Sequence, residues 1–179
     1  SEQATYTEKS SSRGSDFLAK TVEEWEKKAS QAEQYGTRVA CGRFGIILGK
    51  DEGALPLMSL PYKMGVGGKV GSGNQWVSWV HVSDVAKALL YAIENEDFKG
   101  PFNVTSPDPK QMNDFGKILG EILNRPHWIP VPSFALKLIL GDKSQLVLEG
   151  QQVMPDKLLT HGFKFTYPDL PTALKNIYA

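Results

Sequence analysis

A helical segment runs directly into an apolar strand near the start of the chain, and this order restricts the fold more than any other feature. Residues 16–35 repeat apolar side chains along one helical face and are followed by Gly36, a typical helix terminator. Residues 37–48 are β-branched and apolar, which predicts a buried strand interrupted by Gly42 and Gly45. A helix followed by a near-continuous apolar strand favours an α/β fold over an antiparallel meander.

The same alternation of elements continues at residues 73–93, where an aromatic strand joins a helix through a polar elbow. Every second residue from Trp76 to His81 shares one face of the strand, and apolar residues then recur at helical spacing. Ser83 and Asp84 stand where a helix takes its N-cap and its first-turn carboxylate. Such an elbow is also a common place for a binding site, but we favour the structural interpretation.

The texture of the sequence changes after Asn124. A strand at 101–105 and a helix at 113–124 precede the change, and 49–73 is a looser segment. Beyond it we expect a Pro-bracketed extended piece, an apolar helix and short helices around 144–151, 155–160 and 171–178. We therefore divide the chain into an α/β part, residues 1–125, and a small helical C-terminal subdomain, residues 126–179.

Composition limits the classes of partner. The 179 residues carry 20 basic and 20 acidic side chains, which leaves no electrostatic footprint for nucleic acid. The apolar runs are too short to cross a membrane, and Cys41, the single cysteine, fits a reducing, cytoplasmic environment. Because His81, His127 and His161 have no acidic or thiol ligands at metal spacing, no metal site is predicted.

Familiar catalytic and phosphate-binding motifs do not fit the chain. Glycines cluster between residues 65 and 73, but their spacing matches neither the dinucleotide fingerprint nor a P-loop, so we favour a loop or hairpin. There is no G-x-S-x-G for a hydrolase, and none of the six tyrosines is followed by lysine four residues later. Acid–base chemistry of the Tyr-x-x-x-Lys type is therefore absent from this chain.

Two side chains are unusual for their strand positions. Arg43 places a guanidinium in an apolar strand, which is costly unless the charge is paired. An ion pair with a buried carboxylate and a contact with an anion or cofactor are both open for Arg43. His81 is first interpreted as a packed neutral histidine and second as a residue that faces a substrate or cofactor.

Several segments together resemble one family. RVACGRFGIILGKDEGAL, GSGNQWVSWVHVSDVAKAL, GPFNVTSP and the tail with LEGQQVMPDKLLTHGFKFTYPDLPTAL are similar to the NAD-dependent epimerase/dehydratase-like proteins of the extended short-chain dehydrogenase/reductase superfamily. The tail resembles the branch that ends in a small helical domain of unknown function. The resemblance implies an NAD- or NADP-dependent oxidoreductase or epimerase of unknown substrate. This chain would supply its C-terminal half, so that residues 1–125 hold the last strands of a Rossmann-like parallel sheet with substrate-side elements.

The resemblance also implies roles for particular residues. Three would form a wall beside the nicotinamide end of the cofactor: Arg43, Gly45 and Ile46. Three others would line the substrate pocket: Gln75, Trp76 and His81. Many members of the superfamily carry arginine where Trp76 stands and use it on nucleotide sugars. An apolar or aromatic substrate is therefore easier to accommodate here than a nucleotide-sugar diphosphate.

These residues lead to expectations about activity and partners. The polar start of the chain, which lacks methionine, indicates a fragment, and the resemblance implies that the catalytic residues and the phosphate-binding turn lie upstream of Ser1. We therefore expect this chain alone to be inactive and to bind no dinucleotide. The expected partner is a small-molecule substrate rather than nucleic acid or a membrane, and a homodimer is left open. A non-catalytic nucleotide sensor or scaffold on the same fold is the alternative, and a free-standing helical interaction module at 126–179 is a third hypothesis.

Overall fold

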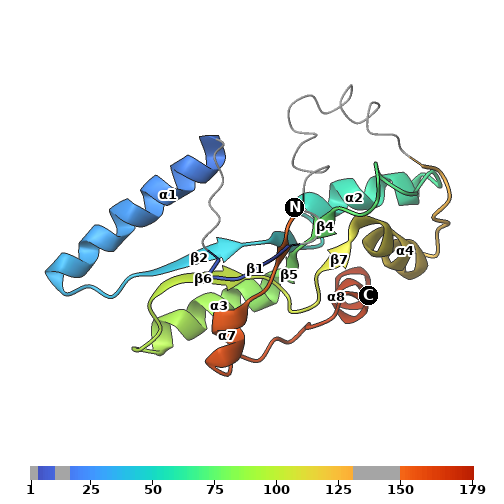
Figure 1. Cartoon of the computed structure of the whole chain (residues 1–179). Coiled ribbons are helices and arrows are strands. Elements are labelled where there is room, and N and C mark those ends of the chain that lie inside the picture. The colour runs from blue at the N-terminus through green and yellow to red at the C-terminus, as the bar shows by residue number, and fades with distance from the viewer. Residues whose placement is uncertain (1–3, 11–16, 131–149) are drawn as a thin grey trace.

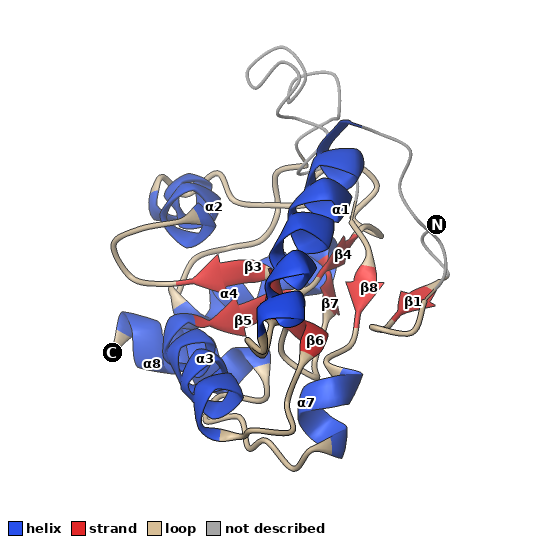
Figure 2. Cartoon of the chain, turned by 90° about the vertical axis from the view of Figure 1, so that its left-hand side faces the viewer, coloured by secondary structure: helices blue, strands red, loops and turns tan. Residues whose placement is uncertain are grey.

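Short strands lie at the centre of the molecule and helices surround them (Figures 1 and 2). The structure is a computed structural model that describes residues 4–10, 17–130 and 150–179. The described helices are α1 (Phe17–Ser30), the 3-10 helix η1 (Gln31–Tyr35), α2 (Ala54–Lys63), α3 (Val82–Glu94), α4 (Met112–Ile122), α7 (Asp156–Thr160) and α8 (Leu170–Tyr178). The described strands are β1 (Thr5–Tyr6), β2 (Ala40–Phe44), β3 (Ile46–Leu48), β4 (Trp76–Val77), β5 (Trp79–His81), β6 (Gly100–Val104), β7 (Lys110–Gln111) and β8 (Gln152–Val153).

Parallel pairs dominate the strand topology. β2 runs beside β6 with Ala40 opposite Gly100, and β3 runs beside β5 with Ile46 opposite Trp79. The connection from β3 to β5 passes through α2, so these three elements form a βαβ unit. β1 and β8 are also parallel, whereas β4 and β7 are antiparallel. The parallel pairing confirms the α/β prediction.

β2 and β3 are one strand path that changes neighbour at Gly45. The Gly45 amide donates to the Val104 carbonyl on the β6 side (3.1 Å), and the next amide, that of Ile46, donates to the Ser78 carbonyl (2.8 Å). A Cβ on Gly45 would lie 2.4 Å from the Ser78 carbonyl oxygen, which is closer than such atoms can approach. Glycine at this position therefore allows the backbones to meet where the strands diverge.

Two clusters of buried side chains hold these elements together. One lies among α2, β5, α4 and α8 and includes Trp79, Phe115 and Leu174. The other lies among α3, β6 and α7 and includes Phe102 and Leu158. Residues 150–179 contribute to both clusters, so the C-terminal part shares its core with the α/β part. The boundary placed at residues 125 and 126 stays a prediction.

Most predicted helices are confirmed within a few residues. Those expected at 16–35, 84–96, 113–124, 155–160 and 171–178 correspond to α1 with η1, α3, α4, α7 and α8. Gly36 ends the first of them with a φ of 77°, in the left-handed conformation expected of a terminator. The apolar helix expected after residue 130 and most of the helix expected around 144–151 lie outside the described residues.

Two expectations were wrong. The segment 49–73 contains the regular helix α2, whose pattern is obscured by Pro56 and Pro61. Proline is tolerated in a first helical turn, where Pro56 lies, because no intrahelical N–H bond is lost there. β2 is half-buried to exposed rather than buried, with exposed Arg43 and Phe44 at its end. Its side chains are only partly covered, and α1, the helix above this strand, has no buried residue either.

The predicted glycine-rich loop is confirmed, and two of its glycines, Gly67 and Gly68, allow close packing. A Cβ on Gly68 would lie 2.0 Å from the Ile129 carbonyl oxygen. Beside this loop, Tyr62 is buried with its hydroxyl 2.8 Å from His127 Nδ1, and His127 Nε2 lies 3.1 Å from the Asn113 side-chain oxygen. The loop is therefore held by contacts with α2, α4 and the segment after α4.

Candidate functional site

The divergence of the strands at Gly45 is the natural place for a ligand in this fold. In open α/β sheets, ligands bind beyond the carboxyl ends of parallel strands, where neighbouring connections part. Here β2 stops pairing with β6 at its carboxyl end, and β3, which continues the same path, pairs with β5. Two apolar side chains beside the break are exposed, Phe44 to 49% and Ile47 to 36%. An exposed apolar surface at a strand end fits a flat ring better than a phosphate.

Of the predicted cofactor wall, Gly45 and Ile46 lie at this break and Arg43 turns toward α1. Arg43 Nε and NH2 each donate to one Glu26 carboxylate oxygen, both at 2.6 Å. This contact with Glu26 raises the pKa of the Arg43 guanidinium above its ordinary value. The ion pair considered from the sequence is therefore present, although Glu26 lies on the half-exposed helix α1 rather than in the core. A cofactor contact of Arg43 stays a prediction.

Of the predicted substrate residues, Gln75 is buried, and its side-chain amide forms hydrogen bonds with the glycine-rich loop. Gln75 Nε2 donates to the Val70 carbonyl (3.0 Å), and Ser72 Oγ donates to Gln75 Oε1 (3.2 Å). Trp76 follows in β4, opposite Gln111, and is half-buried. Trp76 therefore keeps part of its surface exposed. The substrate contacts of both residues remain predictions.

Trp79, on the same strand path, is a core residue. Its side chain is fully buried, and its Nε1 donates to the Asp108 carbonyl (2.8 Å). Trp76 and Trp79 are therefore two indoles with different environments, one partly accessible and one enclosed.

His81 is buried and forms the N-cap of α3. Its Nδ1 accepts from the Ser83 amide (3.1 Å) and lies 2.8 Å from Ser83 Oγ, while its ring packs on Tyr167 with centroids 4.1 Å apart. Burial lowers the pKa of His81, which favours the neutral ring that the cap requires. The structure therefore favours the packed interpretation of His81, and its contact with substrate stays a prediction. The expectation that Ser83 is the cap was wrong by two residues.

Asp84 anchors the C-terminal tail to the start of α3. Its carboxylate is fully buried and accepts from the backbone amides of Thr166 (2.8 Å) and Tyr167 (2.9 Å). A carboxylate with two backbone donors is a structural group. Asp84 lies in the first turn of α3, as predicted, but the pattern gave no signal of its distant partners.

The strand ends carry polar residues that the sequence analysis missed. Ser78 Oγ donates to the Gln151 carbonyl (2.7 Å) and accepts from the Val153 amide (2.9 Å). Thr105 Oγ1 donates to the Val153 carbonyl (3.2 Å). These contacts place residues 151–153 across the amino end of β5 and the carboxyl end of β6, beside Gly45. A polar residue in an apolar strand, as at Ser78, was the available signal.

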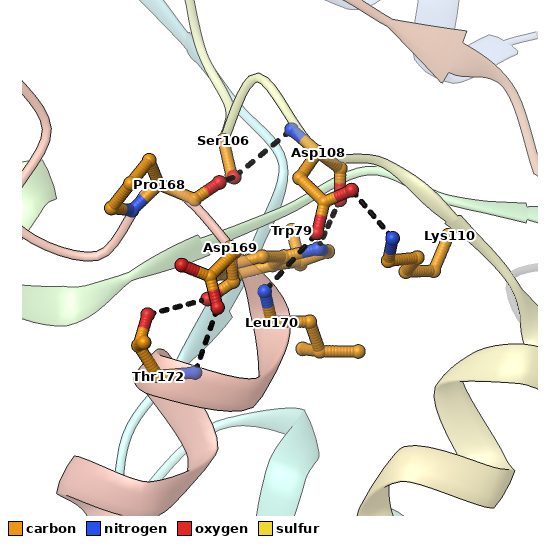
Figure 3. A network of polar contacts seen from close by, with 8 residues as sticks. All are labelled: Trp79, Ser106, Asp108, Lys110, Pro168, Asp169, Leu170 and Thr172. Atoms are coloured by element: carbon orange, nitrogen blue, oxygen red, sulfur yellow. Dashed lines mark hydrogen bonds and ion pairs between the residues drawn. The ribbon is translucent and has the colours of Figure 1, made fainter.

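A second polar network ties the tail to the loop after β6 (Figure 3). Ser106 Oγ donates to the Pro168 carbonyl (2.7 Å) and accepts from the Asp108 amide (3.2 Å). The Asp108 carboxylate accepts from the Leu170 amide (3.2 Å) and pairs with Lys110 (2.6 Å). Asp169 caps α8 through the Thr172 amide (3.0 Å). The candidate site therefore rests on a tail fixed by several polar contacts.

The predicted site residues lie in separate places. Gly45 and Ile46 lie at the strand break, whereas Gln75 and Trp76 lie at β4, beside the glycine-rich loop and β7. Arg43 turns to α1, and His81 lies beside buried Leu48 in the β3–β5 register. Among the residues that the structure describes, no three His, Cys, Asp or Glu side chains are close enough to hold a metal ion.

Parallel strand pairs and a βαβ unit define an α/β protein with the strand arrangement of Rossmann-like folds. Residues 11–105 match the NAD dependent epimerase/dehydratase family, and residues 131–177 match a domain of unknown function, DUF1731. The chain belongs to the NAD-dependent epimerase/dehydratase family, which confirms the resemblance found from the sequence.

Relatives support the same assignment. The chain is 48% identical over 177 residues to the epimerase family protein YfhF of Bacillus subtilis, which covers 99% of this chain and 58% of that protein. The epimerase family protein SAR0825 of Staphylococcus aureus is 48% identical over 173 residues, with 97% and 58% covered. The chain thus spans somewhat over half the length of these relatives.

Solved structures show the fold. The human epimerase family protein SDR39U1 (isoform 2), crystallised with NADPH, superposes with a TM-score of 0.90 at 34% identity, over 99% of this chain and 60% of that chain. A nucleoside-diphosphate sugar epimerase from Corynebacterium glutamicum gives a TM-score of 0.79 at 30% identity, over 98% and 34%. These similarities confirm the Rossmann-like α/β fold class. No helix among the described residues is long and apolar enough to cross a membrane.

Proposed function

We propose that this chain forms the substrate-side part of an NAD(P)-dependent oxidoreductase or epimerase-like protein. The observation that carries the proposal is the exposed apolar strand end around Gly45, where parallel strands diverge. The family assignment and the NADPH in the human relative's structure support NAD or NADP as the cofactor. When bound, the nicotinamide would supply or accept hydride.

The chain's own residues would shape the two sides of the reacting centre. Gly45 and Ile46 would form the wall beside the nicotinamide, because the apolar strand end suits a flat ring. Trp76 would form the substrate side, since a partly accessible indole can stack on an apolar or aromatic substrate. Arg43 would act through Glu26 by fixing α1 against β2, unless a bound anion draws it away.

This chain alone would bind no dinucleotide, because its glycine-rich loop does not match a phosphate-binding pattern. Gly68 instead packs closely on the Ile129 backbone, and Gly67 packs on the Tyr62 ring. The phosphates would therefore require groups that this chain does not supply. The substrate would be a small molecule, and neither nucleic acid nor a membrane is part of the proposal.

The test uses one polypeptide that joins this chain to the part of Bacillus subtilis YfhF that it does not match. We expect quenching or enhancement of nicotinamide fluorescence when NADPH is added, followed by NADPH oxidation with a member of a carbonyl-substrate panel. The unjoined chain should give neither signal. Binding without turnover across the panel would favour the nucleotide-sensing or scaffold alternative, and no binding would contradict the proposal.

A further inference from the structure

The glycine-rich loop that follows α2 is held at its start by the segment after α4. The backbone amides of Trp128 and Ile129 both donate to the Gly67 carbonyl, at 2.9 and 3.1 Å. The Trp128 indole Nε1 also donates to the Gly65 carbonyl (3.0 Å). Figure 1 shows α2, β4 and α4 on the same side of the molecule. The start of the loop therefore depends on the position of residues 128 and 129.

The end of the loop is held by the start of α4. The Asn113 amide donates to the Gly73 carbonyl (3.0 Å), and the Met112 amide donates to the Gln75 carbonyl (2.8 Å). Trp76 follows directly, so both residues expected on the substrate side continue from this end of the loop. The contacts of Asn113 therefore fix the backbone beside Gln75 and Trp76.

His127 connects the two ends of the loop. Its Nδ1 lies 2.8 Å from the Tyr62 hydroxyl at the end of α2, and its Nε2 lies 3.1 Å from the Asn113 side-chain oxygen. Because an amide oxygen can only accept, Nε2 carries the imidazole hydrogen and Nδ1 accepts from Tyr62. Burial raises the pKa of Tyr62 to about 12, so its hydroxyl keeps the hydrogen that it donates. The bonds therefore run in one direction, from Tyr62 through a neutral His127 to Asn113.

A protonated His127 does not fit this arrangement. A second hydrogen on Nδ1 would point at the hydrogen of the Tyr62 hydroxyl, for which the described residues provide no other hydrogen-bond partner. The side chains have little room to rearrange, because a Cβ on Gly116 would lie 2.5 Å from this hydroxyl and 2.7 Å from His127 Cε1. A buried donor without an acceptor is costly, so protonation should break the bond between His127 and Tyr62.

The charges around His127 also oppose a positive ring. The charged side chains on the surrounding elements are more often basic than acidic: Lys63 of α2, Lys69 of the loop, Asp114, Lys117 and Glu121 of α4, and Arg125. Lys63 lies over the Tyr178 ring, and Lys117 pairs with Asp114 at 3.3 Å. Burial and the nearby Lys117 lower the pKa of His127 below its ordinary value. The ring is half-buried, so a proton can reach it from solvent when the pH falls.

We propose that neutral His127 clamps the glycine-rich loop, and that protonation of its ring releases the loop together with Gln75 and Trp76. Once the bond to Tyr62 is lost, His127 no longer ties residues 128 and 129 to α2, and their bonds to the start of the loop weaken. The clamp is a property of this chain and needs no ligand. Its consequence for a bound substrate, a looser substrate side in mild acid, rests on the proposed function.

Nitrogen-15 NMR of the imidazoles in the full 179-residue chain tests the bonding of the ring. At about pH 7.5 we expect His127 to be neutral, with its hydrogen on Nε2. It should titrate below the ordinary histidine value of about 6.5. A neutral ring with its hydrogen on Nδ1 would overturn the proposal, because Tyr62 could not then donate to it.

Hydrogen exchange measures the release of the loop. After correction for the intrinsic effect of pH on exchange, the Trp128 and Ile129 amides should exchange about tenfold faster at about pH 5 than at about pH 7.5. The Ser106 amide, which donates to the Trp79 carbonyl (2.6 Å), is the reference outside the loop. Because buried His81 also titrates, an equal acceleration at Ser106 would show a general loss of stability and would overturn the proposal.

Matched variants separate His127 from the other histidines. His127→Asn keeps an acceptor for the Tyr62 hydroxyl and cannot be protonated, so exchange at residues 128 and 129 should no longer depend on pH. His161→Ala, at the exposed end of α7, should keep the full acceleration. Acceleration that persists in His127→Asn, or none in the unchanged chain, would overturn the proposal. No nucleotide or substrate is present, so this result is separate from the NADPH test of the proposed function.

Discussion

At the scale of single residues, the absence of a side chain at Gly45 decides the shape of the strand end. The strand path can pass from β6 to β5 because nothing projects from Gly45 toward Ser78 and Thr105. Gly49, four residues later, has no such constraint, since a methyl group there would lie 3.6 Å from its nearest neighbour, the Glu52 carbonyl oxygen. Gly49 is therefore a matched control for a substitution at Gly45.

Gly45→Ala should destabilise the protein by about 2 to 3 kcal/mol, because a methyl group would overlap the Ser78 carbonyl and force the strands apart. Gly49→Ala should change the free energy of unfolding by less than about 1 kcal/mol. Urea unfolding of both variants measures the difference. Equal stabilities would show that the close approach at Gly45 is dispensable.

Alanine substitutions of Trp76 and Trp79 should also differ in their effects on stability and binding. In the joined polypeptide, Trp76→Ala should weaken substrate or cofactor binding with a modest loss of stability, because Trp76 is half-buried rather than enclosed. Trp79→Ala should cost about 3 to 5 kcal/mol of stability, because its ring is fully buried. Unfolding curves and NADPH titrations distinguish them. A stability loss in both with unchanged binding would remove Trp76 from the site.

At the scale of elements, α3 begins with a neutral histidine rather than a serine. His81 Nδ1 accepts a hydrogen bond from the Ser83 amide, and protonation at Nδ1 would break this cap. Burial lowers the pKa of His81 below its ordinary value of about 6.5, and burial together with Lys117 lowers the pKa of His127. Both histidines therefore bind protons more readily in the unfolded chain.

The free energy of unfolding should therefore be steady above about pH 7 and fall as the pH drops below the ordinary histidine pKa toward the lower native values. His81→Asn retains an N-cap acceptor and removes one titrating group, so its stability should fall less steeply over the same range. Urea unfolding from about pH 5 to 8 measures both slopes. Identical slopes would show that His81 does not couple protonation to folding.

Regular elements with clear periods could be predicted, and elements defined by distant partners could not. α1, α3, α4 and α8 each carry a helical stripe with a recognisable end, so their positions followed from the sequence. α2 was missed because its prolines mask the period. The short strands β1, β7 and β8 have two residues each, which is too few for a pattern.

The candidate site was predicted in part for the same reason. The interruption of the strand at Gly45 was predicted from a glycine inside an apolar run, whereas its change of neighbour from β6 to β5 was not. The capping role of His81 and the tail contacts of Asp84 depend on bonds to specific backbone groups. Asp84 lies 82 and 83 residues from its two partners, and no local pattern encodes such a contact.

At the scale of the whole molecule, the C-terminal tail, residues 150–179, connects separate elements of the α/β part. It lies across the strand ends through Ser78 and Thr105, and it reaches the start of α3 through Asp84. α8 then packs against α4 in the larger core. The tail therefore forms part of the support of the candidate site.

Asp84→Asn should destabilise the protein by about 1.5 to 3 kcal/mol, because one amide oxygen cannot replace a carboxylate that accepts two backbone bonds. Hydrogen exchange should accelerate first at Thr166 and Tyr167. Asp114→Asn, an exposed first-turn residue of α4, is the control and should have little effect. Unchanged exchange at residues 166 and 167 would contradict the anchoring role.

The most direct measurement of the proposed site is methyl NMR of the joined polypeptide with labelled isoleucine. We expect NADPH to shift the Ile46 methyl signal and ADP-ribose, which lacks the nicotinamide, to leave it nearly unchanged. Ile177, buried in the core around α8, should respond to neither ligand. An Ile46 signal that ignores bound NADPH would contradict the placement of the nicotinamide at the strand end.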